Sequence, residues 1–325
     1  MNIRLSSLDG AGASMLASAT PNWDLDRVVA GLREVRESWR EAQQRRHEYG
    51  GRELPSPETL RQLLLSLRGA LFPMRLGPAD LRQESEDFYV GHTLDAALNN
   101  LLVQVRLELR YAARQTNAGA TSLELQAAGI VRDFAGALPD IRRLLDTDVA
   151  AAFRGDPAAR SVDEVLLCYP GVVAMIHHRI AHKLHQLGVP LLARIVAELA
   201  HSETGIDIHP GAQIGPGFFI DHGTGVVIGE TAIIGRNVRV YQAVTLGAKR
   251  FSSDEAGTLH KGLPRHPIVE DDVVIYAGAS VLGRVTIGKG SVIGGNVWLT
   301  RSVSAGSNVT QANSQHEVLN HGGGI

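Results

Sequence analysis

The chain has 325 residues, of which 44% are hydrophobic and 20% are charged, and its formal net charge at pH 7 is −2. This length suggests more than one domain, with enough apolar material for buried cores. The near-neutral charge gives no electrostatic reason to expect nucleic acid or an anionic membrane as a partner.

The cysteine content and the lack of a long apolar segment both favour a protein of the reducing cell interior. The single cysteine, Cys168, excludes an internal disulfide and any metal site built from several thiolates. Asp9 interrupts the apolar residues near the N-terminus, which argues against a signal peptide. No segment approaches the roughly 18 uncharged apolar residues of a membrane-spanning helix. We therefore expect a cytoplasmic protein that binds neither membrane nor nucleic acid.

The first two hundred residues have the apolar spacing of amphipathic helices. After a candidate N-cap at Asp24, apolar residues recur at helical spacing; they are Leu25, Val28, Val29, Leu32, Val35 and Trp39. A second helix is predicted to begin at Ser56-Pro57. Further helices are predicted over about 94–114, 122–153 and 171–201. We expect residues 1–60 to form an amphipathic helical extension for docking or oligomerisation, and residues 61–202 to form a helical domain.

From residue 203 onwards the hydrophobic period changes to six. The large aliphatic residues of this pattern are Ile208, Ile214, Ile220, Ile228, Ile234, Val240 and Leu246, followed by Val269, Ile275, Val281, Ile287, Ile293 and Leu299. A helix would give a period of 3.6 and a simple strand a period of 2. A period of six indicates a short strand and a turn on each face of a coil, with the aliphatic side chains stacked inside. We predict a parallel β-helix over residues 203–303 and a flexible tail over residues 304–325.

Two departures from this period mark candidate functional segments. Ile220 and Ile228 are eight residues apart, so two extra residues must bulge from the coil within Asp221-His222-Gly223-Thr224-Gly225. The register is lost again over 247–268, which must leave the coil as an excursion loop. A solenoid needs neither feature for stability, and interruptions of a rigid scaffold are common places for binding and catalysis.

Four short motifs in the repeat region resemble those of a known family. They are Asp207-Ile208-His209-Pro210, Ile220-Asp221-His222-Gly223-Thr224-Gly225, Ile228-Gly229-Glu230-Thr231-Ala232 and Val244-Thr245-Leu246-Gly247. They are similar to those of the serine acetyltransferases, a family of hexapeptide acyltransferases, and the resemblance extends from about Asp156 to the C-terminus. It implies an α+β fold, in which an N-terminal all-helical domain precedes a left-handed parallel β-helix. It also implies a serine O-acetyltransferase, which moves acetyl from acetyl-CoA to L-serine and gives O-acetyl-L-serine and CoA in cysteine biosynthesis.

The resemblance also assigns roles residue by residue. It implies that His222 is the general base for the serine hydroxyl and that Asp207 orients it. The residues expected to bind serine are Asp156, Asp221, Arg265 and His266. The CoA arm is expected to contact backbone groups at Ala277 and Gly295. In one departure from the family, Val292 stands where a basic residue often lies near the CoA phosphates.

The assigned chemistry is sound on physical grounds. A serine hydroxyl is a poor nucleophile at neutral pH, and a histidine with an ordinary pKa of roughly 6.5 suits the task of removing its proton. A carboxylate on the other ring nitrogen fixes the tautomer and stabilises the imidazolium. Asp207 and His222 are separated by nearly one turn of a coil, so we expect them on one face. An arginine such as Arg265 offers a bidentate match to the carboxylate of an amino acid.

The resemblance further implies partners and an assembly. The C-terminal Ile325 is expected to enter the active site of O-acetylserine sulfhydrylase, with Gly322-Gly323-Gly324 as an extendable linker. L-cysteine, which differs from serine only in sulfur for oxygen, is expected to act as a feedback inhibitor. We expect a homo-trimer or a dimer of trimers, with active sites between subunits. Acetyl-CoA is expected as a co-substrate, with no permanently bound cofactor and no metal.

Three alternatives remain open at this point. The chain could be another hexapeptide acyltransferase, or a β-helix zinc carbonic anhydrase that uses His209, His222 and His266. It could also be a scaffold without catalytic activity. A further group of histidines, consisting of His177, His178, His182 and His185, suggests a metal site less strongly than packing on a helix face.

Overall fold

The computed structural model describes residues 23–43, 54–116, 120–249, 260 and 262–311. The chain divides into two compact units, Met1–Gly51 and Arg52–Ile325, and each is described separately. In the first unit, α1 spans Leu25–Ala42, and the side chains of its predicted apolar stripe are about half exposed or more. Asp24 occupies the N-cap position of this helix, as predicted, but its side chain makes no capping hydrogen bond.

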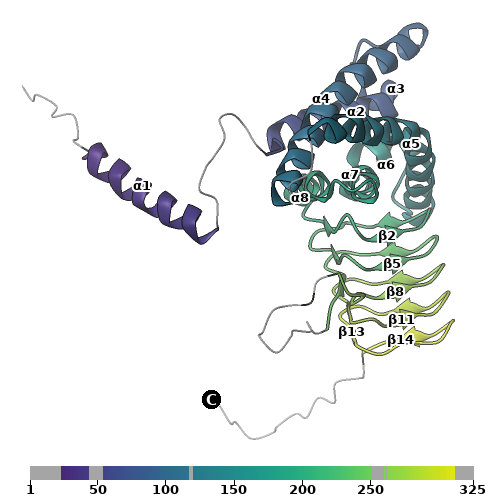
Figure 1. Ribbon diagram of the computed structural model, residues 1–325. Coiled ribbons are helices and arrows are strands. Elements are labelled where there is room, and N and C mark those ends of the chain that lie inside the picture. The colour runs from purple at the N-terminus through teal and green to yellow at the C-terminus, as the bar shows by residue number, and fades with distance from the viewer. Residues whose placement is uncertain (1–22, 44–53, 117–119, 250–259, 261, 312–325) are drawn as a thin grey trace, which may run out of the picture. The chain divides into compact units, whose positions relative to one another are not determined.

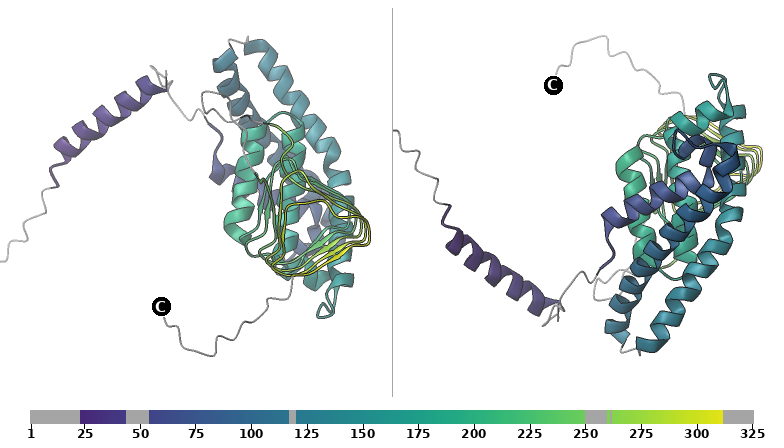
Figure 2. Two further views of the ribbon diagram at one scale, coloured as in Figure 1. Left: turned by 90° about the horizontal axis from the view of Figure 1, so that it is seen from below. Right: turned by 90° about the horizontal axis from the view of Figure 1, so that it is seen from above.

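The second unit begins with a group of packed helices (Figure 1). They are α2 (Pro57–Leu71), α3 (Pro73–Leu76), the 3-10 helix η1 (Gln83–Ser85), α4 (Glu86–Thr116), α5 (Ala120–Gly155), α6 (Val162–Cys168), α7 (Pro170–Gln186) and α8 (Pro190–Thr204). The hydroxyl of Ser56 accepts a hydrogen bond from the backbone N–H of Thr59 and caps α2. This part of the unit therefore begins before residue 60, where the sequence suggested a boundary. The long helices α4 and α5 pack side by side (Figure 2).

The rest of the second unit is a parallel coil of short strands. The strands are β1 (Asp207–Ile208), β2 (Gln213–Ile214), β3 (Phe219–Ile220), β4 (Val227–Ile228), β5 (Ile233–Ile234), β6 (Arg239–Val240), β7 (Thr245–Gly247), β8 (Ile268–Val269), β9 (Val274–Ile275), β10 (Ser280–Leu282), β11 (Thr286–Ile287), β12 (Val292–Ile293), β13 (Trp298–Leu299) and β14 (Asn308–Val309). Figure 1 shows them stacked in layers below the helices. Each aliphatic residue of the period of six lies in one of β1–β13, and all except Leu299 are buried.

Three parallel sheets form the faces of the coil. Their strand orders are β1-β4-β7-β10-β13, β11-β8-β5-β2 and β14-β12-β9-β6-β3. The stacking is in register, as in the column Ile220, Val240, Ile275 and Ile293. The pairing of β14 with β12 carries the coil past residue 303, where the sequence placed its end.

Two corners between these sheets contain most of the predicted site residues of the coil. The corner that follows β3, β6, β9 and β12 contains residues 221–226, 241–244, 276–279 and 294–297, and we call it the His222 corner. The corner that follows β1, β4, β7 and β10 contains residues 209–212 and 229–232 and both ends of the excursion loop, and we call it the loop corner. The chain leaves this second corner after β7 and returns at β8.

A buried ion pair fixes the helices onto the first turn of the coil. Arg179 on α7 and Asp148 on α5 are 5% and 2% exposed, and their closest nitrogen–oxygen distance is 3.0 Å. Arg179 also donates to the carbonyl oxygens of Ile214 and Gly215, and Asp148 accepts from the backbone N–H of Phe218. Each charge therefore has partners in both parts, which offsets the cost of removing it from water. As a result, the C-terminal end of α5 is held against β3.

Candidate active site

His222 lies at the tip of the predicted bulge. Its backbone φ is +59°, a left-handed conformation that few residues other than glycine adopt. The side chain is 69% exposed, and its Nε2 lies 4.0 Å from Oδ1 of Asp221. The turn is kept tight by Gly223, at φ +96°, where an added Cβ would come within 2.5 Å of the Ile206 side chain. The bulge thus directs the imidazole away from the coil, where a substrate can reach it.

Asp207 lies beside the same corner without touching His222. It begins β1, and its backbone N–H donates to the carbonyl oxygen of Val226 over 2.9 Å. Within the described part of the chain, no hydrogen bond or ion pair joins Asp207 to His222. The sequence predicted that the two residues lie on one face of the coil, and the pairing of their side chains stays a prediction.

The two predicted acids of the serine site lie together near His222. Asp156 follows directly after α5 and accepts hydrogen bonds from the hydroxyl of Tyr169 and from the backbone N–H of Ala158. Asp221 accepts a hydrogen bond over 3.3 Å from Nη2 of Arg239 on β6, and the same nitrogen donates to the carbonyl oxygen of Gly155. The end of the helical domain and the corner of the coil therefore meet at one polar site.

The hydrogen bonds and charges at this site favour the ionised form of Asp156. The hydrogen bond from Tyr169 is the main reason that the pKa of Asp156 is lowered, and the backbone N–H of Ala158 and the charges of Arg239 and His222 act in the same direction. The same hydrogen bond raises the pKa of Tyr169 to about 12, so this phenol remains a donor. A site with ionised carboxylates suits a cationic group such as an amino acid's ammonium.

Arg265 and His266 lie at the loop corner instead. Nη2 of Arg265 donates to Oε2 of Glu230 over 2.6 Å. The imidazole of His266 is 6% exposed, and its Nδ1 lies 3.1 Å from the backbone nitrogen and 2.9 Å from the hydroxyl of Thr231. The ring packs over Gly229, where an added Cβ would lie 2.0 Å from its atoms. The absence of a side chain at this glycine makes room for the histidine.

The surroundings of His266 at the loop corner favour its neutral form. Burial, together with the charge of Arg265, lowers the pKa of His266 to about 4, against the opposing charge of Glu230. The geometry agrees, because Nδ1 accepts the N–H of Thr231 and so leaves the ring proton on Nε2. Burial raises the pKa of Glu230, but the hydrogen bond from Arg265 and nearby positive charges outweigh it, so the net shift is downward.

The expected CoA contacts lie in the same column as His222. Ala277 and Gly295 belong to successive layers of the His222 corner, and the N–H of Asn296 donates to the carbonyl oxygen of Ala277 over 2.8 Å. Val292 lies in β12 and pairs with Val274 of β9. The column therefore runs from Asp221 and His222 down to the layers that are expected to hold the CoA arm.

Sequence reasoning missed three residues in or beside the His222 corner. They are Arg239, Tyr169 and Tyr241. The guanidinium of Arg239 lies 4.9 Å from the ring centres of both Phe219 and Tyr241, and Tyr241 stacks on Tyr276. The available signal was the spacing of 18 residues between Asp221 and Arg239, about one turn of the coil.

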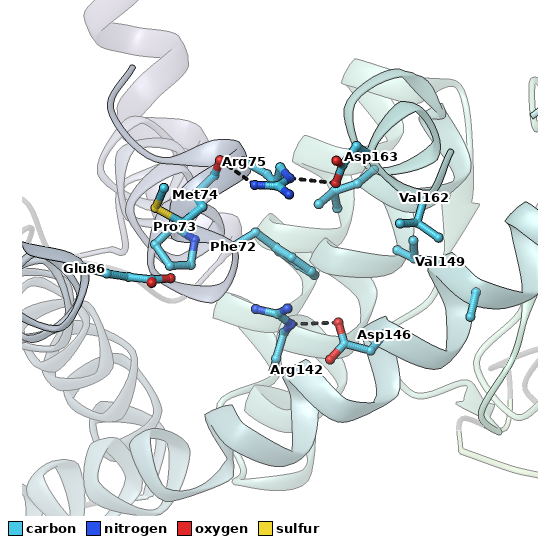
Figure 3. Close-up of a pocket in the computed structure, with 12 residues that line it drawn as sticks. Phe72, Pro73, Met74, Arg75, Glu86, Arg142, Asp146, Val149, Val162 and Asp163 are labelled. Carbon is cyan, nitrogen blue, oxygen red and sulfur yellow. Dashed lines mark hydrogen bonds and ion pairs between the residues drawn. The ribbon is translucent and has the colours of Figure 1, made fainter. Parts of the chain in front are cut away.

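A separate cavity of about 350 Å³ lies among α3, α4, α5 and α6. Figure 3 shows Arg75 directed at Asp163 and Arg142 directed at Asp146, with the ring of Phe72 lying between the two pairs. None of the predicted site residues lines this cavity. Because these arginines are already paired with carboxylates, we expect the substrates at the His222 corner and not in this cavity.

The histidines do not form a metal site in the described residues. No group of three or more side chains of the ligating types is arranged there to hold an ion. His209 interacts with the charges of the loop corner, whereas His222 lies at the other corner, so the three histidines of the carbonic anhydrase alternative do not converge within one chain. His178 is buried on α7 and stacks on His182 at a centroid distance of 5.6 Å. This group is consistent with packing between α7 and the coil.

Comparisons with known proteins agree with the fold. Residues 266–301 match the family described as bacterial transferase hexapeptide (six repeats). A plasmid-encoded serine acetyltransferase of Synechococcus elongatus is 58% identical over 84% of this chain and 86% of its own length. Among solved structures, Entamoeba histolytica serine acetyltransferase 1 in complex with L-cysteine has a TM-score of 0.66 and 38% identity over 82% of this chain and 90% of its own. The Neisseria gonorrhoeae enzyme in complex with serine has a TM-score of 0.51 and 27% identity over 77% of this chain and 95% of its own.

The fold and these likenesses define an acyltransferase of the hexapeptide-repeat class, with a helical domain followed by a left-handed parallel β-helix. The chain belongs to the serine acetyltransferase family, and it is an enzyme of that activity. The described part of the chain contains no helix with the length and apolar character needed to span a membrane.

Proposed function

We propose that the enzyme transfers acetyl from acetyl-CoA to the hydroxyl of L-serine, with His222 as the general base. The observation that carries this mechanism is the exposed imidazole of His222 on a bulge with Asp221 beside it. His222 removes the proton of the serine hydroxyl as its oxygen attacks the thioester carbonyl. Collapse of the tetrahedral intermediate then releases CoA as a thiol, which takes up a proton, and leaves O-acetyl-L-serine.

Asp207 completes this base when the substrates are bound. Its backbone is hydrogen-bonded to Val226 of the His222 corner, and its carboxylate moves to the imidazole when the substrates bind. Hydrogen bonds of catalytic groups are often long in the free enzyme and tighten in the complex. A carboxylate in that position stabilises the imidazolium that forms when the base takes up the serine proton.

Serine binding in this proposal uses two corners from two subunits. Asp156 and Asp221 hold the ammonium group at the His222 corner, while Arg265 and His266 hold the carboxylate from a loop corner. These corners lie on different edges of the coil in one chain. A threefold axis parallel to the coil places a different corner of the next subunit against the first. We therefore propose a trimer, or a dimer of trimers, with the active site between neighbours.

Acetyl-CoA lies along the lower layers of the His222 corner. Ala277 and Gly295 offer backbone groups there, and a side chain at Gly295 would approach the carbonyl oxygen of Ala277 to 3.3 Å. This direction brings the thioester towards His222 at the upper end of the column. Since Val292 supplies no charge, the phosphates of CoA must be held by other groups.

Cysteine and a partner enzyme complete the proposal. The Entamoeba relative was solved with L-cysteine and the Neisseria relative with serine. We propose that L-cysteine inhibits this enzyme by occupying the serine site in cysteine biosynthesis, since both molecules present the same ammonium and carboxylate. Ile325 lies outside the described residues, and its binding to O-acetylserine sulfhydrylase stays a prediction.

Release of CoA in the presence and absence of serine tests the reaction and its base. We expect His222→Ala to lower kcat by about 10²-fold or more, because the loss of a positioned base typically costs that much. His201→Ala is the matched control, since His201 is an exposed histidine on α8 that pairs with Glu198. Near-normal turnover by His222→Ala would overturn the mechanism. Absence of serine-dependent CoA release in the wild type would overturn the function.

A further inference from the structure

Arg239 occupies the centre of the acidic group at the His222 corner. It lies on β6, one layer below Phe219 of β3, with which it pairs in register. Its guanidinium is 4.9 Å from the ring centres of Phe219 and Tyr241. Its Nε is buried and has no hydrogen-bond partner among the described residues. The contacts with two aromatic faces fix the orientation of the planar group and compensate in part for this lost hydrogen bond.

One nitrogen of this arginine joins the helical domain to the catalytic corner. Nη2 donates to the carbonyl oxygen of Gly155, at the end of α5, and to Oδ2 of Asp221. The other carboxylate oxygen of Asp221, Oδ1, is the one that lies 4.0 Å from Nε2 of His222. Asp221 is thus held between Arg239 and His222, with one oxygen towards each. A rotation of this carboxylate would break its hydrogen bond with Arg239 and change its distance from His222.

Arg239 also balances charge between two carboxylates. Asp156 follows Gly155 in sequence, and the positive charge of Arg239 lowers its pKa. Two carboxylates at one binding site repel each other, and a fixed cation close to both reduces this repulsion. Because the guanidinium is only a quarter exposed, water screens this effect less than at the surface.

We propose that Arg239 is a positioning residue for serine acetylation, which acts on the substrate through Asp221. This inference rests on the proposed serine site. Arg239 sets the carboxylate of Asp221 for the serine ammonium and keeps it beside the catalytic imidazole. Phe219 and Tyr241 hold the guanidinium, and Gly155 links its position to that of Asp156. A substitution of Arg239 therefore changes the affinity for serine and leaves the affinity for acetyl-CoA unchanged.

The test is a comparison of Arg239→Met with Arg236→Met, followed by a double-mutant cycle. Arg236 is exposed at a different corner of the same layer and is the matched control. We expect Arg239→Met to raise the KM for serine by about tenfold and to change the KM for acetyl-CoA by less than about twofold, because only the serine groups depend on Asp221. Arg239→Lys should be intermediate, since it keeps the charge without the planar contacts. Arg236→Met should match the wild type.

The cycle with Asp221→Asn separates a positioning role from a general structural one. If Arg239 acts through Asp221, the double variant should be no worse than the more impaired single variant. Fully multiplicative losses would overturn the proposal, as would serine kinetics of Arg239→Met equal to those of Arg236→Met. If Arg239→Met does not fold, Arg239→Lys and Tyr241→Leu serve instead. An unchanged KM for serine in both folded variants then overturns it.

Calorimetric titration with L-serine alone distinguishes this proposal from the proposed function. Weaker serine binding in Arg239→Met than in Arg236→Met supports the positioning role without any turnover. An unchanged KM for serine in Arg239→Met, in an enzyme that loses activity on His222→Ala, overturns the role of Arg239 and leaves the reaction intact. Failure of the wild type to bind serine overturns both.

Discussion

The His222 corner and the loop corner hold histidines in opposite ways. His222 stands on a strained bulge with 69% of its side chain exposed, and its nearest carboxylate oxygen, on Asp221, is 4.0 Å away. His266 is 6% exposed and is held through Nδ1 by Thr231. A general base must be reached by its substrate and must be free to take up and release a proton. A group that only binds the substrate gains when its orientation is fixed before binding. The same side chain therefore fits two tasks, and its surroundings decide which one.

The largest expected effect is the recovery of activity when two inactive variants, one from each corner, are assembled into the same oligomers. His222→Ala and Arg265→Met should each lower serine acetylation by about 10²-fold or more, because one removes the base and the other a carboxylate partner. If each site takes His222 from one subunit and Arg265 from the next, random co-assembly of the two variants leaves about a quarter of the sites intact. Activity of co-expressed, co-purified chains measures this fraction.

A control shows whether the recovered activity comes from shared sites. Co-expression of His222→Ala with His222→Asn should restore nothing, since every site then lacks the imidazole. If His222→Ala and Arg265→Met also restore nothing when the mixed trimer is shown to form, the two corners do not serve one site. The different surroundings of His222 and His266 would then need an explanation within a single chain.

A smaller effect is expected from filling the space under the buried histidine. In Gly229→Ala, the new Cβ would lie 2.0 Å from the imidazole of His266, so the ring must move. Overpacking of this kind costs about 1–3 kcal/mol and should weaken serine binding at the loop corner. Gly136→Ala on α5 is the control, because nothing lies within 4 Å of its added Cβ. Urea denaturation and the KM for serine measure both consequences. Unchanged serine kinetics in Gly229→Ala would separate His266 from substrate binding.

The sequence predicts the coil far better than the contacts at its corners. A period of six follows directly from side chains that stack once per strand, so the aliphatic residue of each of β1–β13 could be named. The last strand, β14, was missed because Val309 is ten residues after Leu299 and breaks this period. The bulge at His222 was found for the same reason, as an interruption of a regular pattern.

The residues that set the site's electrostatics could not be found in this way. Arg239 occupies an outward position of a short strand, where an arginine is usually solvated, and only the pairing of β3 with β6 places it at Asp221. The expected contact between Asp207 and His222 rested on spacing along the coil, which fixes a layer and a face but no side-chain distance. The partners of Arg265 depend on where the excursion loop returns, and a loop carries no period.

The smallest expected effect concerns the pH dependence of stability at the loop corner. Burial lowers the pKa values of His209 and His266 to about 4. In the unfolded chain both would titrate near their ordinary pKa of about 6.5. Between these values the unfolded state binds more protons than the folded state, so the free energy of unfolding falls as pH falls from about 6.5 towards 4. Above about 6.5 these two groups should add no pH dependence.

Urea denaturation at intervals between pH 4.5 and 7.5 measures this dependence, and His266→Gln tests its origin. The variant should lower the slope of the curve by about 1 kcal/mol per pH unit in the middle of the window, because glutamine cannot take up the proton but can still accept the hydrogen bond from Thr231. A pH dependence in His266→Gln equal to that of the wild type would contradict the inference that the buried, neutral imidazole at the loop corner sets part of the curve.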